Sequence, residues 1–171
     1  MPEKPLVGIV MGSDTDLPVM TAAAQTLKEF GIPFELEITS AHRSPGRTSE
    51  YGRTAIQRGL KVIIVGAGGA AHLAGVLASE TILPVVGVPM ATTSLAGFDA
   101  LLATVQMPGG IPVATMAIDR AGAVNAAIFA AEILGLSDPE IARKLVAHKE
   151  DLAKSVTEKN ARLQKQISEN K

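Results

Sequence analysis

The side chains best suited to chemistry lie together in one short stretch, Ser40-Ala41-His42-Arg43-Ser44-Pro45. The imidazole of His42 can take up or release a proton near neutral pH. The guanidinium of Arg43, next to it, can hold a phosphate or a carboxylate through paired hydrogen bonds. A proton carrier beside an anion-binding group indicates chemistry on a small anionic molecule.

Two further stretches have residues suited to binding anions. Gly12-Ser13-Asp14-Thr15-Asp16 can offer backbone N–H groups and hydroxyls to an anion, with a carboxylate nearby for the hydroxyls of a sugar. The alternative is that Ser13 or Asp14 only caps a helix. Gly66-Ala67-Gly68-Gly69-Ala70-Ala71 carries little side-chain bulk, so a ligand can approach its backbone closely and its N–H groups can bind a carboxylate.

The glycine-rich stretch also matches the loose G-x-G-x-x-A pattern of dinucleotide-binding proteins. In those proteins an acidic residue about twenty positions later binds the ribose. Gly87-Val88-Pro89-Met90 occupy that region here. Binding of a nicotinamide or flavin dinucleotide is therefore disfavoured.

Strands and helices alternate along the part of the chain that carries these stretches. Continuous or alternating apolar runs predict strands at 6–11, 33–39, 62–65, 84–88 and 112–118. Helical spacing of apolar residues predicts helices at 17–30, 47–58, from about 73 to 81, 98–105 and 121–136. Such alternation predicts an α/β fold with an open, mostly parallel sheet and helices on both faces.

Ligands of open parallel sheets bind beyond the carboxyl ends of the strands. The loops that begin at Gly12, Ser40, Gly66 and Pro89 should share that edge. His42 and His72 would then follow two adjacent strands, which favours a common site over two structural histidines. A metal ion held by both histidines and an aspartate of this edge is an alternative, but no dense pattern of ligands supports it.

A different pattern begins at Ser137-Asp138-Pro139, which predicts a helix N-cap followed by proline at the first helical position. Beyond it, a narrow apolar stripe recurs on a charged helix, formed by Ile141, Leu145, Leu152, Val156, Leu163 and Ile167. This helix continues past the last expected strand. We therefore expect one domain over residues 1–171, in which 138–171 is a helical extension that packs on another subunit, with His148 a solvated surface residue.

Composition excludes several classes of function. A chain of 171 residues with 47% hydrophobic residues fits a single domain, and a net charge of −1 with 3% aromatic residues argues against nucleic acid as a partner. With no cysteine, disulfides and thiolate metal sites are impossible. No apolar run reaches the ~18 residues of a membrane helix, and the start of the chain lacks the pattern of a signal peptide. We expect a cytoplasmic protein without membrane contact.

Four motifs in this order resemble those of the class I 5-(carboxyamino)imidazole ribonucleotide mutases, which belong to the AIR carboxylase family. The resemblance covers about residues 6–135 and rests on Met11-Gly12-Ser13-x-x-Asp16, Ser40-Ala41-His42-Arg43-x-Pro45, Gly66-Ala67-Gly68-Gly69-Ala70-Ala71-His72-Leu73 and Gln106-Met107-Pro108. It implies a three-layer flavodoxin-like (Rossmann-like) domain, a homo-octamer with active sites at subunit contacts, and no metal or organic cofactor. It also implies a reaction of purine biosynthesis, the reversible move of a carboxylate from the exocyclic nitrogen to ring carbon 4 of an aminoimidazole ribonucleotide.

The resemblance also assigns roles to residues. His42 is expected to be the general acid and base, Ser13 and Arg43 to hold the phosphate of the substrate, and Asp16 its ribose hydroxyls. Ser40 would line the same pocket. The residues expected to border the carboxylate or carbon dioxide are Ala67, Gly68, Gly69, His72 and Leu73.

Two other functions remain open from the sequence. A related class of enzymes carboxylates the ring directly with free carbon dioxide, but there the histidine is followed by lysine, whereas this chain has Arg43. The other alternative is a flavodoxin-like module that binds a phosphorylated ligand without turning it over. One departure from the family pattern is Ala74, where members commonly have proline, and it bears only on the stiffness of the loop.

Overall fold

Strand β1, Val7–Met11, lies inside the sheet between two other strands and is buried along its whole length. The structure is a computed structural model that describes residues 4–169. After β1 the chain continues through η1 (Asp14–Asp16), α1 (Leu17–Phe30), β2 (Phe34–Ile38), α2 (Pro45–Arg58), β3 (Val62–Gly68), α3 (Leu73–Glu80), β4 (Val85–Met90), α4 (Phe98–Val105), β5 (Ala114–Thr115), α5 (Asp119–Gly135) and α6 (Pro139–Glu169). The predicted alternation of strands and helices is therefore confirmed.

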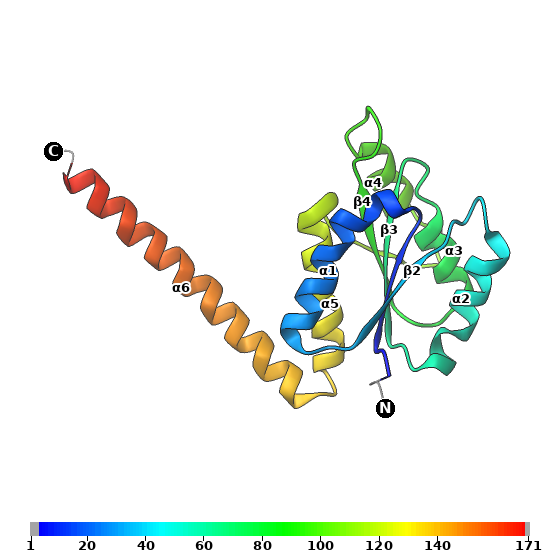
Figure 1. Cartoon of the computed structure of the whole chain (residues 1–171), viewed down its shortest axis with the longest axis horizontal. Coiled ribbons are helices and arrows are strands. Elements are labelled where there is room, and N and C mark those ends of the chain that lie inside the picture. The colour runs from blue at the N-terminus through cyan, green and yellow to red at the C-terminus, as the bar shows by residue number, and fades with distance from the viewer. Residues whose placement is uncertain (1–3, 170–171) are drawn as a thin grey trace.

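All five strands are parallel, in the order β2-β1-β3-β4-β5. Helices α1 and α5 cover one face of the sheet, and α2, α3 and α4 cover the other (Figure 1). This is the flavodoxin-like three-layer fold, whose ligand crevice lies where the strand order reverses, between β1 and β3. The expectation that β2 and β3 are adjacent is wrong, because β1 lies between them.

Strands β3 and β4 are both longer than predicted. Glycine and proline predicted their ends at 65 and 88, yet the pairing continues until Gly68 lies opposite Met90. Strand β5 is much shorter than the predicted 112–118 and keeps only two residues. Pro112 has no N–H to donate to a ladder, and after Met116, whose N–H still bonds Gly87 at 2.8 Å, the chain turns into α5.

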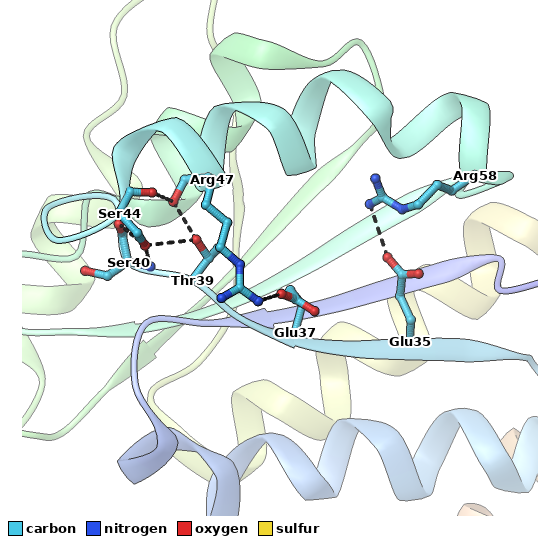
Figure 2. Close-up of polar contacts among 8 residues, drawn as sticks. Glu35, Glu37, Thr39, Ser40, Ser44, Arg47 and Arg58 are labelled. Carbon is cyan, nitrogen blue, oxygen red and sulfur yellow. Dashed lines mark hydrogen bonds and ion pairs between the residues drawn. The ribbon is translucent and has the colours of Figure 1, made fainter.

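Strand β2 is the edge of the sheet and is only partly covered. Leu36 and Ile38, on its apolar side, are more than two-fifths exposed. On the other side, Glu37 is paired with Arg47, and Glu35 with Arg58 at 3.2 Å, so that two ion pairs join β2 to α2 (Figure 2). The start of α2 is thus fixed against the strand that leads into the Ser40–Arg43 turn.

Helix α6 leaves the domain and projects well beyond it (Figure 1). Asp138 caps its start, accepting hydrogen bonds from the N–H groups of Glu140 and Ile141 at 2.9 and 3.2 Å, as predicted. His148 is not the freely solvated residue expected, because its ring packs edge-on against Phe30 with 5.5 Å between centroids. Within residues 4–169, no helix has both the length and the apolar character needed to cross a membrane.

Candidate functional site

A cavity of about 320 Å³ opens at the carboxyl ends of β1 and β3, where the strand order reverses. It collects residues from four loops that are far apart in the sequence. Those that line it are Gly12, Ser13, Thr15, Asp16, Ser40, Ala41, His42, Arg43, Ala67, Gly68, Ala70, His72, Leu73 and Thr92. The loops after β1, β2, β3 and β4 therefore meet at one edge, as the alternation of elements predicted.

The turn after β1 is a capping box. The Ser13 hydroxyl accepts a hydrogen bond from the Thr15 N–H at 3.3 Å, while the Ser13 N–H donates to the Asp16 carboxylate at 3.2 Å. The capping alternative is thus observed for Ser13. It does not remove Ser13 from the site, because both Ser13 and Asp16 also line the cavity.

Asp16 is a buried carboxylate at the wall of this cavity, with only 4% of its surface exposed. Burial raises its pKa above the ordinary value, the N–H groups of Ser13 and Gly12 oppose the rise, and the charge of Asp14 adds to it. A carboxylate held with part of its solvation removed is well suited to accept hydrogen bonds from a ligand's hydroxyls.

The turn after β2 brings His42 and Arg43 to the cavity. Ser40 holds this turn closed, since its carbonyl accepts the Ser44 N–H at 2.8 Å and its hydroxyl accepts the Arg43 N–H at 3.2 Å. The Arg43 guanidinium reaches across to the carbonyl of Gly12 at 3.3 Å. A cation therefore stands beside the Ser13 turn, and together they form a place for an anion.

His42 and His72 are in contact, although β2 and β3, the strands that precede them, are not neighbours in the sheet. His42 Nε2 lies 2.8 Å from His72 Nδ1, and their rings are edge to face with 4.9 Å between centroids. At this distance one ring nitrogen donates and the other accepts, so a single proton lies between the two imidazoles. The pair offers a group that can gain and lose a proton inside the cavity.

The third wall is bare backbone from the end of β3. A side chain at Gly68 would overlap Thr92, because an added Cβ would lie 2.0 Å from the Thr92 Oγ1. Thr92 therefore occupies the space beside this glycine, and both residues line the cavity. Gly69, at φ +58, makes the turn toward α3 but does not itself line the cavity.

The structure brings every predicted site residue except Gly69 to one cavity. Prediction from the sequence missed Thr92 as a lining residue, whereas Thr15 belongs to the predicted Gly12–Asp16 stretch. The signal for Thr92 was present in the topology, since the loop after β4 was expected at this edge, but its residues have no distinctive chemistry. The Gln106-Met107-Pro108 motif follows α4 and lies outside the cavity. Among residues 4–169, no group of three or more His, Cys, Asp or Glu side chains is placed to hold a metal ion.

Comparison with known proteins identifies relatives over nearly the whole chain. A family model described as AIR carboxylase matches residues 6–155. A Pyrococcus horikoshii protein named N5-carboxyaminoimidazole ribonucleotide mutase is 58% identical over 162 residues, which are 95% of this chain and 90% of that protein. A Bacillus subtilis protein of the same name is 51% identical over 160 residues, 94% of this chain and 99% of that protein.

A solved structure is also similar to this chain. The crystal structure of Treponema denticola PurE superimposes with a TM-score of 0.83 at 31% identity, covering 93% of this chain and 98% of that one. Similarity of sequence and similarity of structure thus agree on one family.

Proposed function

Because this chain belongs to the AIR carboxylase family, we propose that it interconverts N5-carboxyaminoimidazole ribonucleotide and 4-carboxy-5-aminoimidazole ribonucleotide in purine biosynthesis. The proposal is carried by the curated relatives, which share 51% to 58% of their residues with this chain and bear the mutase name. The cavity at the switch point supplies residues that suit this chemistry.

The reaction breaks one carbon–nitrogen bond and forms one carbon–carbon bond. When the carbamate loses carbon dioxide, the exocyclic nitrogen takes up a proton. When ring carbon 4 attacks the trapped carbon dioxide, that carbon loses its proton. A single group that gives a proton in one step and takes one in the other balances both, and His42 is that group.

The remaining residues bind and orient the substrate. Arg43 and Ser13, which stand on either side of the anion position, hold the phosphate. Asp16 accepts hydrogen bonds from the ribose hydroxyls, and Ser40 lines the same pocket. Carbon dioxide stays beside ring carbon 4 in the region lined by Ala67, Gly68, His72 and Leu73, which replaces an encounter in solution by an oriented one, and Gly69 makes the turn that follows this region.

The proposal extends to the assembly. Helix α6 carries an apolar stripe in which Leu152, Val156 and Leu163 are each at least half exposed, and this supports packing of residues 138–171 on another subunit. The family resemblance adds a homo-octamer with active sites at subunit contacts, and a cytoplasmic location. Light scattering of the purified protein measures the subunit number.

An absorbance assay that follows exchange between the two carboxylated ribonucleotides tests the function. Wild-type protein should interconvert them without added bicarbonate, whereas dependence on bicarbonate and aminoimidazole ribonucleotide would favour the direct carboxylase. A folded protein that binds the ribonucleotide without exchange would instead be a binding module.

His42→Asn should retain ligand binding and lose most turnover. The matched control is His148→Asn, because His148 lies on α6, packs against Phe30 and does not line the cavity. Near-normal turnover in His42→Asn would remove His42 from the proton-transfer role.

A further inference from the structure

Three hydroxyls outside the cavity join the end of β2 to the start of α2 (Figure 2). Thr39 is 2% exposed, and its N–H donates to the carbonyl of Met11 at 3.0 Å, which ties it to β1. Its Oγ1 lies 2.9 Å from the Oγ1 of the fully buried Thr48 and 3.3 Å from the Oγ of Ser44. A buried polar group lowers stability unless its hydrogen bonds are made, so these contacts stabilise the fold.

The acceptors allow the hydroxyl protons to be assigned. The Ser44 hydroxyl donates to the carbonyl of Ser40 at 3.1 Å, and the Thr48 hydroxyl donates to the carbonyl of Ser44 at 3.2 Å. The Thr39 hydroxyl then donates its proton to the hydroxyl oxygen of Thr48 or of Ser44. The Ser44 oxygen also accepts the Ser40 N–H at 3.0 Å. The N–H and the carbonyl of Ser40 therefore both form hydrogen bonds with the Ser44 hydroxyl.

Ser44 is unusual for its position. It is the N-cap residue of α2, where a serine hydroxyl normally accepts an N–H of the first helical turn, yet it makes no such bond. Its hydroxyl is turned back to Ser40 instead. Helix α2 thus lacks a side-chain cap at Ser44, and the Ser44 hydroxyl instead holds the turn that carries His42 and Arg43.

We propose that Thr39, Ser44 and Thr48 are positioning residues that hold the Ser40–Arg43 turn so that His42 and Arg43 face the cavity. This inference rests on the proposed function. The chain of contacts runs from β1 through Thr39 to Thr48 and Ser44, and from Ser44 to both backbone groups of Ser40. Through these contacts the sheet, rather than the loop alone, fixes the positions of His42 and Arg43.

The test compares variants that remove one buried hydroxyl each. Thr39→Val and Thr48→Val keep the shape of the side chain and lie outside the cavity. Thr26→Val is the matched control, because Thr26 is also buried and bonds a helix carbonyl, that of Ala22, at 2.9 Å. Thr39→Ser, which retains the hydroxyl, is the rescue variant.

All three valine variants should lower the melting temperature. Only Thr39→Val and Thr48→Val should lower kcat/KM, by roughly 10- to 100-fold, because a small displacement of oriented groups costs rate at that scale. They should also speed amide exchange at Ser40, and Thr39→Ser should restore both readouts. Kinetics and Ser40 exchange like those of Thr26→Val would overturn the proposal.

The outcomes separate this inference from the proposed function. If the wild-type protein shows no exchange of the two ribonucleotides, the proposed function fails. Amide exchange at Ser40 in Thr39→Val against Thr26→Val then decides whether the hydroxyls hold the turn. If Thr39→Val does not fold, Thr48→Val gives the same comparison from the other end of the pair.

Discussion

Gly8, in the centre of β1, and Tyr51, on α2, provide a quantitative test of the packing beneath the site. A Cβ added at Gly8 would lie 2.2 Å from the Tyr51 hydroxyl oxygen but 3.4 Å from the ring carbon that bears it. Within residues 4–169 that hydroxyl is buried without a hydrogen-bond partner, and burial, together with the nearby Glu35 carboxylate, raises its pKa. Gly8→Ala therefore collides mainly with this oxygen atom, which Tyr51→Phe removes, and also presses on Leu60 Cδ1 at 3.1 Å, which remains.

The magnitude follows from two opposing terms. Overpacking costs about 1–3 kcal/mol, and the upper part of that range applies because the Arg58 guanidinium, 4.3 Å above the ring, restricts how far Tyr51 can move. Replacing a strand glycine by alanine raises the free energy of unfolding by about 0.5–1 kcal/mol, because glycine loses more conformational entropy on folding. Gly8→Ala should therefore lose about 1–2 kcal/mol of unfolding free energy. Tyr51→Phe alone should be neutral or slightly stabilising, since it removes an unpartnered buried hydroxyl.

The double variant Gly8→Ala/Tyr51→Phe should recover most of the stability that Gly8→Ala loses, with only the Leu60 contact left, which makes the coupling free energy about 1–2 kcal/mol. Urea unfolding at one fixed protomer concentration measures all four proteins, because association changes apparent stability. Equal destabilisation of the single Gly8→Ala and the double variant would refute the reasoning, since the hydroxyl would then not be the obstacle. Turnover should stay unchanged, because neither residue lines the cavity.

Three further predictions concern single positions. Asp16→Asn should melt at a higher temperature than wild type at pH 7 but lose activity. Burial raises the pKa of Asp16 in the folded protein, so its ionised form destabilises the fold. The difference in melting temperature should therefore shrink as pH falls through that raised pKa toward 3.8. Asp138→Ala should lose about 0.5–2 kcal/mol through its two N-cap hydrogen bonds, measured by thermal unfolding, and an unchanged melting temperature would contradict this. Leu163→Glu should reduce the subunit number in light scattering, whereas Lys154→Glu, on the opposite face of α6, should not.

Local patterns were enough to predict the elements and most of the site. Buried apolar runs predicted β1 along its length, and Gly31 and Gly59 end α1 and α2 with positive φ, as their positions indicated. The sequence placed His42 and Arg43 after a strand, and the general rule for parallel sheets placed that strand end at the ligand edge. These inferences succeed because burial and turn conformation depend on a few neighbouring residues.

Only the tertiary structure decided which elements are neighbours. Periodicity reports that a strand is buried but not what lies beside it, so the position of β1 between β2 and β3 was not foreseen. For the same reason Thr92 was not connected with Gly68, nor Thr39 with Thr48. The ends of β3 and β4 are wrong in the prediction because glycine and proline usually end a strand, whereas here the hydrogen bonds between β3 and β4 continue past them.

The sequence by itself determined the chemical groups at the site and the order in which the chain supplies them. Tertiary structure decided that the imidazoles of His42 and His72, which follow strands separated by β1, stand 2.8 Å apart. The physical reason is that the ends of β2 and β3 lie two strand spacings apart, about 10 Å, a gap that the two turns close together, and local sequence does not specify which strand lies between them.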